Sequence, residues 1–273
     1  MKTVITPQQH WYTFNYKELN NYRDLFYFLA WRDIKVRYKQ TAVGVLWAFF
    51  VPFISMVVFT IFFGNLVTLN TAGIPYPIFV FVGLLFWTFF SQAVTNASNS
   101  LVSSQDIIKK IYFPKVLLPA ASILVTVFDF FIAALILIGM LLYYHITPNL
   151  LALVIVPLLM VITYITAFSL GLFLAALNVK YRDVRYVIPF FVQILLFFTP
   201  VIYPTTTISS SYQWILQLNP MSTVIETART VLLSHSNTIA WQQLFFALLM
   251  SIIVTLISWL YFKKTERYFA DII

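Results

Sequence analysis

The chain has 273 residues, of which 61% are apolar and only 10% are charged, and its mean hydropathy is +0.86. Soluble domains are roughly 45–50% apolar and about 25% charged, so this composition excludes a soluble protein and predicts an all-α integral membrane protein. The sequence contains no cysteine, which excludes disulfides, thiolate metal sites and a cysteine nucleophile.

The amino-terminal region, residues 1–41, is predicted to be cytoplasmic and to contain an amphipathic helix at the membrane interface over about 21–39. Helical geometry places apolar residues on one stripe of this helix and cations on another. The apolar stripe contains Tyr27, Trp31, Ile34 and Tyr38; the cationic stripe contains Arg32, Lys35 and Lys39, and Arg37 follows Asp33 by four residues.

Six segments are long and apolar enough to cross a membrane, since a helix needs about 20 apolar residues to span roughly 30 Å of hydrocarbon. They are residues 43–67, 78–102, 116–144, 151–177, 186–203 and 241–262. We therefore expect one transmembrane domain of six helices over residues 42–263, followed by a cytoplasmic tail over 264–273.

The cations predict the orientation of these spans. Of the 17, seven lie in the amino-terminal region, three between the second and third spans, three between the fourth and fifth, and three in the tail. Sixteen therefore fall on one side, and the positive-inside rule makes that side the cytoplasm. Both termini are expected inside, and the net charge of +8 is explained by the membrane rather than by nucleic acid.

Residues 204–233 contain apolar pieces that are too short to span, and Asn219 and Pro220 interrupt them. A seventh span would place the cationic tail on the wrong side of the membrane. We expect two short helices that re-enter the outer half of the bundle, where protein or water must cover the broken backbone. An ordinary external loop is the alternative.

Asp129 is the single carboxylate within the six expected spans. One interpretation is a proton or cation relay, as in ion-coupled carriers. The other is a polar anchor bonded to a Tyr, Asn or Ser of a neighbouring helix. We favour the anchor, because neither a second acid nor a cation accompanies Asp129 in the spans.

Two cytoplasmic loops are candidates for docking a partner. The stretch SSQDIIKKIYFPKVLLP predicts a short amphipathic helix that begins after Ser103 or Ser104, carries a stripe of isoleucines and stops at Pro114. The same helix would suit a surface of anionic lipid equally well. In the second loop, Arg182, Asp183 and Arg185 are expected to pair with one another or with a partner.

The motifs of nucleotide and hydrolytic chemistry are absent from the sequence. None of the six glycines begins a P-loop, and the chain has no G-x-S-x-G or H-E-x-x-H motif. The three histidines are far apart, so no metal site is expected. We expect a protein that is not an enzyme and that takes energy for transport from a partner.

Five stretches carry a family resemblance. They are WRDIKVRYKQTAVGVLWAFFVPF at 31–53, YPIFVFVGLLFWTFFSQAVTNASNSLV at 76–102, IIKKIYFPKVLLP at 107–119, NVKYRDVRYVIPF at 178–190 and LNPMSTVIETARTVLL at 218–233. In this order they resemble the permease subunit of type-2 ABC exporters for polysaccharides, which move lipid-linked O-antigen, capsular polysaccharide or teichoic acid out of bacterial cells.

The resemblance implies a homodimer in the bacterial inner membrane, bound to two copies of a separate ATP-binding subunit that holds ATP and Mg. It implies three functional regions. The coupling region would contain Asp106, Ile107, Ile108, Lys109, Lys110, Ile111 and Tyr112, together with Arg182, Asp183 and Arg185. The cytoplasmic interface or gate would contain Trp31, Arg32, Ile34, Lys35, Arg37, Tyr38 and Lys39. The external gate would contain Trp214, Asn219, Pro220, Met221, Glu226 and Arg229.

Aromatic residues make up 19% of the chain and offer surfaces along which sugar rings can slide. Phe49 and Phe53 in the first span, with Phe197 and Phe198 in the fifth, are candidates for lining a dimeric channel; packing against lipid and other helices is the alternative. Two other functions stay open, a type-2 ABC permease for a small hydrophobic molecule or drug, and an ion-coupled carrier that uses Asp129.

Overall fold

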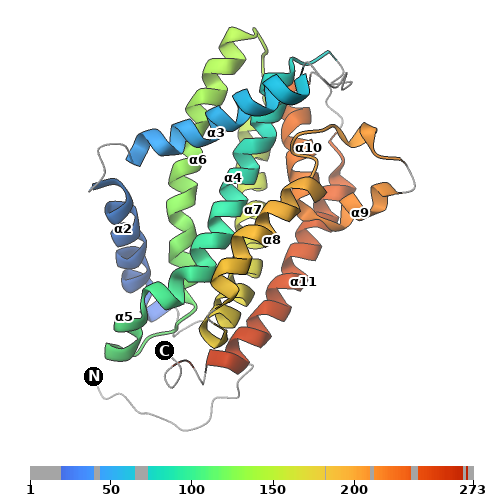
Figure 1. Cartoon of the computed structure of the whole chain (residues 1–273). Coiled ribbons are helices and arrows are strands. Elements are labelled where there is room, and N and C mark those ends of the chain that lie inside the picture. The colour runs from blue at the N-terminus through green and yellow to red at the C-terminus, as the bar shows by residue number, and fades with distance from the viewer. Residues whose placement is uncertain are drawn as a thin grey trace.

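The computed structural model describes residues 20–39, 44–64, 73–181, 183–209, 212–234, 239–266 and Phe269. Regular structure in these ranges is helical, and the long helices form one elongated bundle (Figure 1). The elements in chain order are α2 (Arg23–Lys39), α3 (Gly44–Phe59), the π-helix η1 (Thr60–Gly64), α4 (Tyr76–Ser103), α5 (Gln105–Lys110), α6 (Leu117–Tyr143), α7 (Ala152–Lys180), α8 (Val184–Phe198), the 3-10 helix η2 (Thr205–Thr207), α9 (Gln213–Leu218), α10 (Pro220–Leu233) and α11 (Trp241–Glu266).

Five helices of the described chain are long and apolar enough to cross a membrane, namely Leu46–Gly64, α4, α6, α7 and α11. The fifth predicted span, 186–203, corresponds to α8, which has only 15 residues and ends at Phe198. Its end has a local cause. Pro200 disfavours the α conformation at the residue before it, and Thr199 is extended with φ −109° and ψ 136°.

The central helix of the bundle is α4. In its most apolar stretch 78% of the residues are buried, compared with 11% in Leu46–Gly64, which lies at the periphery. Small residues bring α4 close to α7, because a Cβ atom on Gly171 would lie 2.5 Å from that of Ala97. Close approach through small residues is a usual way to associate helices in a membrane, where burial of apolar surface alone does not drive it.

Polar contacts fasten α7 to two other helices. The hydroxyls of Thr166 and Ser251 lie 2.8 Å apart and join α7 to α11. Towards α4, Asn178 Nδ2 donates to the carbonyl of Ser98 at 3.0 Å and to Asn99 Oδ1 at 3.1 Å. These contacts hold α4, α7 and α11 together as one unit, and the shorter elements pack against it.

The end of the bundle that carries α5 is held together by contacts between distant segments. Lys115 donates from its backbone N–H to Glu266 Oε1 at 3.2 Å and from Nζ to the Glu266 carbonyl at 3.3 Å. Tyr22 donates to the carbonyl of Tyr112 at 3.3 Å. The start of α6, the end of α11 and the residues before α2 therefore lie at the same end, which Figure 1 shows at the bottom.

Candidate coupling and translocation sites

The surface around α5 is the first candidate site. Ile108 is buried in an apolar cluster that also contains Leu29 of α2, whereas Ile111 is 57% exposed and Tyr112 is 82% exposed. The expected stripe of Ile107, Ile108 and Ile111 is therefore divided. Ile108 holds α5 against the bundle, and Ile111 and Tyr112 are left on the surface.

The boundaries of α5 differ from the expected ones. Ser104 occupies the cap position but its side chain makes no capping hydrogen bond, and the helix ends at Lys110 because Ile111 is extended. Pro114 therefore lies four residues beyond the helix and does not stop it. Asp106 lies in the first turn and Lys109 and Lys110 in the last, where each charge is favourable to the helix dipole.

The second candidate site joins α2 to the middle of α6. Arg37 Nη2 lies 2.9 Å from Asp129 Oδ2 and also donates to Gln92 Oε1 of α4 at 3.1 Å. Tyr38 donates its hydroxyl to Asp129 Oδ1. The expected bond of Asp129 to a tyrosine is present, and Arg37, which lies outside the expected spans, adds a cation that the sequence reasoning did not anticipate.

Tyr38 also titrates abnormally. Its burial, and then its hydrogen bond to the Asp129 carboxylate, raise its pKa above the ordinary 10.0. The phenol therefore stays protonated and remains a donor at physiological pH. Protonation of the phenol therefore does not limit this contact between α2 and α6 in that range.

The face of α2 that packs on the bundle is not the expected apolar stripe. Leu29 and Ala30 are buried, whereas Tyr27 and Trp31 are exposed. Asp33 pairs with its neighbour Arg32 at 2.7 Å rather than with Arg37. Of the remaining residues in this region, Ile34 is half-buried and Lys35 and Lys39 are exposed. The helix thus contacts the bundle through Leu29 and Ala30 and through Tyr38 at its end, and leaves Tyr27 and Trp31 of the expected stripe on the surface.

The loop between α7 and α8 is described except for Arg182, which lies outside the described residues. Asp183 and Arg185 are both exposed, and the part of this loop that is described contains no ion pair between them. Arg185 instead lies over the ring of Tyr186 at 5.0 Å. Asp183 and Arg185 therefore do not pair with each other, and the pairing of this loop with Arg182 or with a partner stays a prediction.

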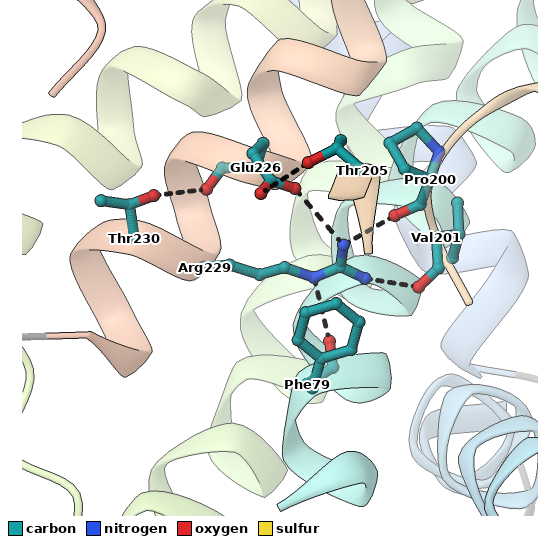
Figure 2. Close-up of polar contacts among 7 residues, drawn as sticks. All are labelled: Phe79, Pro200, Val201, Thr205, Glu226, Arg229 and Thr230. Atoms are coloured by element: carbon teal, nitrogen blue, oxygen red, sulfur yellow. Dashed lines mark hydrogen bonds and ion pairs between the residues drawn. The ribbon is translucent and has the colours of Figure 1, made fainter. Parts of the chain in front are cut away.

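The region around α10 contains one buried cation, Arg229, whose side chain is only 4% exposed. Figure 2 shows its guanidinium donating to three carbonyls, those of Phe79 at 3.2 Å, Pro200 at 2.7 Å and Val201 at 2.5 Å. It also lies 3.6 Å from the centre of the Phe79 ring. Arg229 thus joins α10 to the first turn of α4 and to the segment after α8.

Neighbouring residues hold the Arg229 side chain in place. Glu226 Oε2 lies 3.7 Å from Arg229 Nη1, and Glu226 Oε1 accepts from Thr205 at 3.2 Å (Figure 2). A Cβ on Gly83 would lie 2.7 Å from both Arg229 Nη2 and the Val201 carbonyl. The guanidinium and this carbonyl can therefore lie so close to α4 only because residue 83 has no side chain. Arg229 and Glu226 were expected in an external gate, and the structure places Arg229 in a buried clamp.

The start of α10 is fixed by Asn219 and Pro220, the pair that interrupts the sequence there. Asn219 Oδ1 accepts from the Met221 N–H at 3.0 Å, and Asn219 Nδ2 donates to Thr199 Oγ1 at 2.8 Å. Pro220 occupies the first helical position, where its missing N–H is no loss. Met221 is buried, while Trp214 in α9 is 59% exposed. The two short helices expected here are confirmed as helices.

The four candidate channel phenylalanines all lie on the surface of the single chain. Phe49 and Phe53 of α3 stack at 6.0 Å and border an apolar cavity of about 600 Å³ between α3, α4 and α6. Phe197 and Phe198 of α8 are 59% and 61% exposed. The structure does not bring the two pairs together within one chain.

Two features escaped the sequence reasoning. One is the pairing of Arg37 with Asp129, which no local pattern shows because the residues are 92 positions apart in the chain. The other is the polar second half of α4, where Ser, Thr, Asn and Gln make up eight of the 13 residues 91–103. The signal for the second was present in the composition of that segment.

Comparisons with known proteins agree with this architecture. The profile of the family described as "ABC-2 type transporter" matches residues 24–233. An O-antigen export system permease protein RfbA of Myxococcus xanthus is 29% identical over 221 residues, which are 80% of this chain and 84% of that protein. An O-antigen export system permease protein RfbA of Klebsiella pneumoniae is 25% identical over 92% of this chain and 95% of its own.

A third relative is the polysialic acid transport protein KpsM of Escherichia coli, 24% identical over 72% of this chain and 77% of its own. The family match covers α2 to α10, so it includes the surface of α5, the Arg37–Asp129 contact and the Arg229 clamp. The chain therefore belongs to the ABC-2 type transporter family.

Proposed function

We propose that this chain is the permease subunit of an ATP-driven exporter that moves lipid-linked polysaccharide across the bacterial cytoplasmic membrane. The observation that carries the proposal is the similarity, over most of the chain, to three proteins named for O-antigen export or polysialic acid transport. The products in those names are all surface polysaccharides, so the shared cargo is a glycan.

The proposed topology has six crossings with both termini in the cytoplasm. Five long helices and the shorter α8 supply the crossings. At about 1.5 Å per residue the 15 residues of α8 cover about 22 Å, and Thr199–Tyr203 would complete the passage. The positive-inside rule then places α5, with Lys109 and Lys110, on the cytoplasmic side.

The external side of the proposed topology is formed by α9 and α10 as a re-entrant pair. Most of α10 is buried between other helices, as expected of a short helix that re-enters the bundle. Trp214 and the start of α10 would form the external gate, with Arg229 holding the pair in place.

ATP hydrolysis is proposed to take place in a separate subunit, which would bind ATP and Mg. Two copies of it would dock beneath a homodimer of this chain, with the exposed face of α5 as the coupling contact. Support comes from the exposure of Ile111 and Tyr112, because a large aliphatic and an aromatic side chain suit the core of a protein interface.

The dimer would enclose the channel between the exposed faces of α3 and α8. Only 11% of the residues in the most apolar stretch of Leu46–Gly64 are buried within the single chain. Phe49 and Phe53, together with Phe197 and Phe198, would then face the glycan or the partner protomer.

A permease for a small hydrophobic molecule is the second candidate. The observation in its favour is the apolar cavity of about 600 Å³ bordered by Phe49 and Phe53, a volume in the range of ligand pockets. An ion-coupled carrier is less well supported, because Asp129 is already engaged by Arg37 and Tyr38.

Deletion of the gene tests the proposal. We expect loss of the surface glycan and accumulation of its undecaprenyl-linked precursor inside the cell, both reversed by the wild-type gene. A deletion strain that keeps its surface glycan and changes only in drug sensitivity would support the second candidate and refute the first.

A further inference from the structure

The second half of α4 presents a continuous polar stripe. Gln92, Asn96, Asn99 and Ser103 follow one another at intervals of four, three and four residues, which places them on one face of the helix. None of these side chains is fully buried, whereas the neighbouring Ala93 and Ala97 are. A polar face inside a membrane protein requires water, protein or a ligand opposite it.

Two cavities with mixed polar and apolar linings lie along this stripe. One, of about 300 Å³, lies between α2, α4 and α6 and is bordered by Asn96, Asn99 and Ser103. The other, of about 480 Å³, lies between α4 and α8 and is bordered by Gln92, Asn96 and Gln193. Asn96 and Arg37 border both cavities, so the two meet at these residues.

The amides of Asn96, which is half-buried, and of Gln193, which is exposed on the single chain, have no hydrogen-bond partner among the described residues. An amide left without partners in an apolar medium is costly, so these groups need water or a polar ligand. Each amide offers two N–H donors and one acceptor oxygen, the combination that a neighbouring pair of sugar hydroxyls requires.

The charges of the cavities are internally compensated. Arg32 pairs with Asp33 at 2.7 Å, and Arg37 pairs with Asp129 at 2.9 Å. The polar surface therefore consists of amides and hydroxyls around two neutralised cations, which favours an uncharged, hydroxyl-rich ligand over a free anion.

We propose that Gln92, Asn96, Asn99 and Gln193 form a hydrogen-bonding track for the uncharged sugar units of the transported glycan, running along α4 through both cavities. The inference rests on the proposed function and adds to it the side chains that contact the cargo. The combined size of the cavities lies within the roughly 300–1,000 Å³ typical of ligand sites.

The first test measures whether water reaches the side chains of the track. The chain is suited to cysteine labelling because it has no cysteine of its own. Asn96→Cys and Gln193→Cys are introduced singly into the complete transporter in inside-out vesicles and treated with a water-soluble methanethiosulfonate. We expect both to react at least about tenfold faster than the matched control Ala93→Cys, which lies one turn from Asn96 and is fully buried. Equal rates would overturn the proposal.

The second test measures whether sugar uses the track. Asn96→Leu and Gln193→Leu keep the approximate volume and remove the hydrogen bonds, and we expect each to lower glycan export at least about fivefold at normal levels of assembled transporter. Asn96→Gln and Gln193→Asn retain the amide and should restore most of the export. Gln243→Leu in α11 is the control, since Gln243 is exposed and borders neither cavity.

The outcomes separate the two proposals. If deletion of the gene leaves surface glycan intact, the proposed function is wrong. If deletion abolishes export but the assembled leucine variants export normally, the exporter is real and the sugar track is wrong. Variants that fail to assemble are replaced by Asn96→Ser and Gln193→Ser, which should show a smaller loss of export; unchanged export in both would again refute the track.

Discussion

Arg37 Nη2 lies 2.9 Å from Asp129 Oδ2, so a cation at the end of α2 neutralises the one carboxylate in the middle of α6. A carboxylate that is 7% exposed is costly to leave charged and unpaired. The pair explains how an acid can occupy this position without acting as an ion relay.

Removing the Asp129 carboxylate is expected to affect stability more than transport chemistry. Asp129→Leu should destabilise the transporter by about 1–3 kcal/mol, less than a fully buried pair would lose because Arg37 is about a third exposed. Asp129→Asn, which keeps an acceptor for Tyr38 and Arg37, should export within about twofold of wild type. The measurements are Tm in detergent and ATP-driven export. A normally assembled Asp129→Asn protein without export would instead support the interpretation of Asp129 as an ion relay.

Tyr38→Phe removes one hydrogen bond from the same carboxylate. We expect a loss of about 1 kcal/mol, the usual net contribution of a hydrogen bond. Since the pKa of Tyr38 is raised above 10.0, the hydrogen bond is present in full below that value, and the loss should be equal at about pH 6 and about pH 9. A loss that disappears at the higher pH would contradict the raised pKa; Tyr27→Phe, at an exposed position, is the control.

The Arg229 clamp predicts a strong effect at a position far from α5. Arg229→Met would leave three carbonyls without their donor, and we expect a destabilisation of about 3 kcal/mol or more, seen as loss of assembled protein. Arg229→Lys should rescue it only in part, because a single ammonium cannot match the planar guanidinium. Glu226→Gln is the milder comparison, since its contact is 3.7 Å long and Glu226 is 41% exposed.

Two glycines give opposite predictions. Gly83→Ala places a Cβ 2.7 Å from the Val201 carbonyl, which is backbone and cannot move aside cheaply, so a loss of stability is expected. Gly139→Ala, also in a helix interior, meets no atom within 4 Å and should be neutral or stabilise by up to about 1 kcal/mol. Thermal unfolding of the two purified variants compares them directly, and equal effects would contradict the close packing at Gly83.

The division of the isoleucines of α5 predicts separate phenotypes. Ile111→Ser with Tyr112→Ala should release the co-purifying ATP-binding subunit or uncouple its hydrolysis while Tm stays unchanged, since both side chains are exposed. Ile108→Ser should lower Tm, because it places a hydroxyl in the buried cluster. If coupling survives the loss of Ile111 and Tyr112, α5 is a lipid-facing helix instead.

The long helices were predictable because continuous apolar segments leave little choice of structure in a membrane. The predicted span 151–177 corresponds to α7, Ala152–Lys180, and 241–262 corresponds to α11, Trp241–Glu266. The predicted span extends beyond the end of α8 because the apolar sequence continues through Val201 and Ile202. The helix ends earlier because Pro200 disfavours the helical conformation at Thr199.

The candidate sites were less predictable because they depend on tertiary contacts. The apolar stripe of α2 was read from periodicity, but a helix with apolar residues on more than one side can use either face. Leu29 and Ala30 are buried in a cluster with residues of α6, and Arg37 and Tyr38 of the same helix contact Asp129, which lies about 90 residues further along the chain.

The helix α4 connects α5 to the Arg229 clamp and can transmit movement between them. The 28 residues of α4 form a rod about 42 Å long. At one end α5 follows after a single residue, Ser104, and at the other the first turn carries Phe79, whose carbonyl and ring hold Arg229 of α10. A tilt of this rod by about 5° displaces its far end by about 4 Å. Rotation of one stiff element is thus enough to link events at α5 with the position of α10, and no relay of small side-chain movements is needed between them.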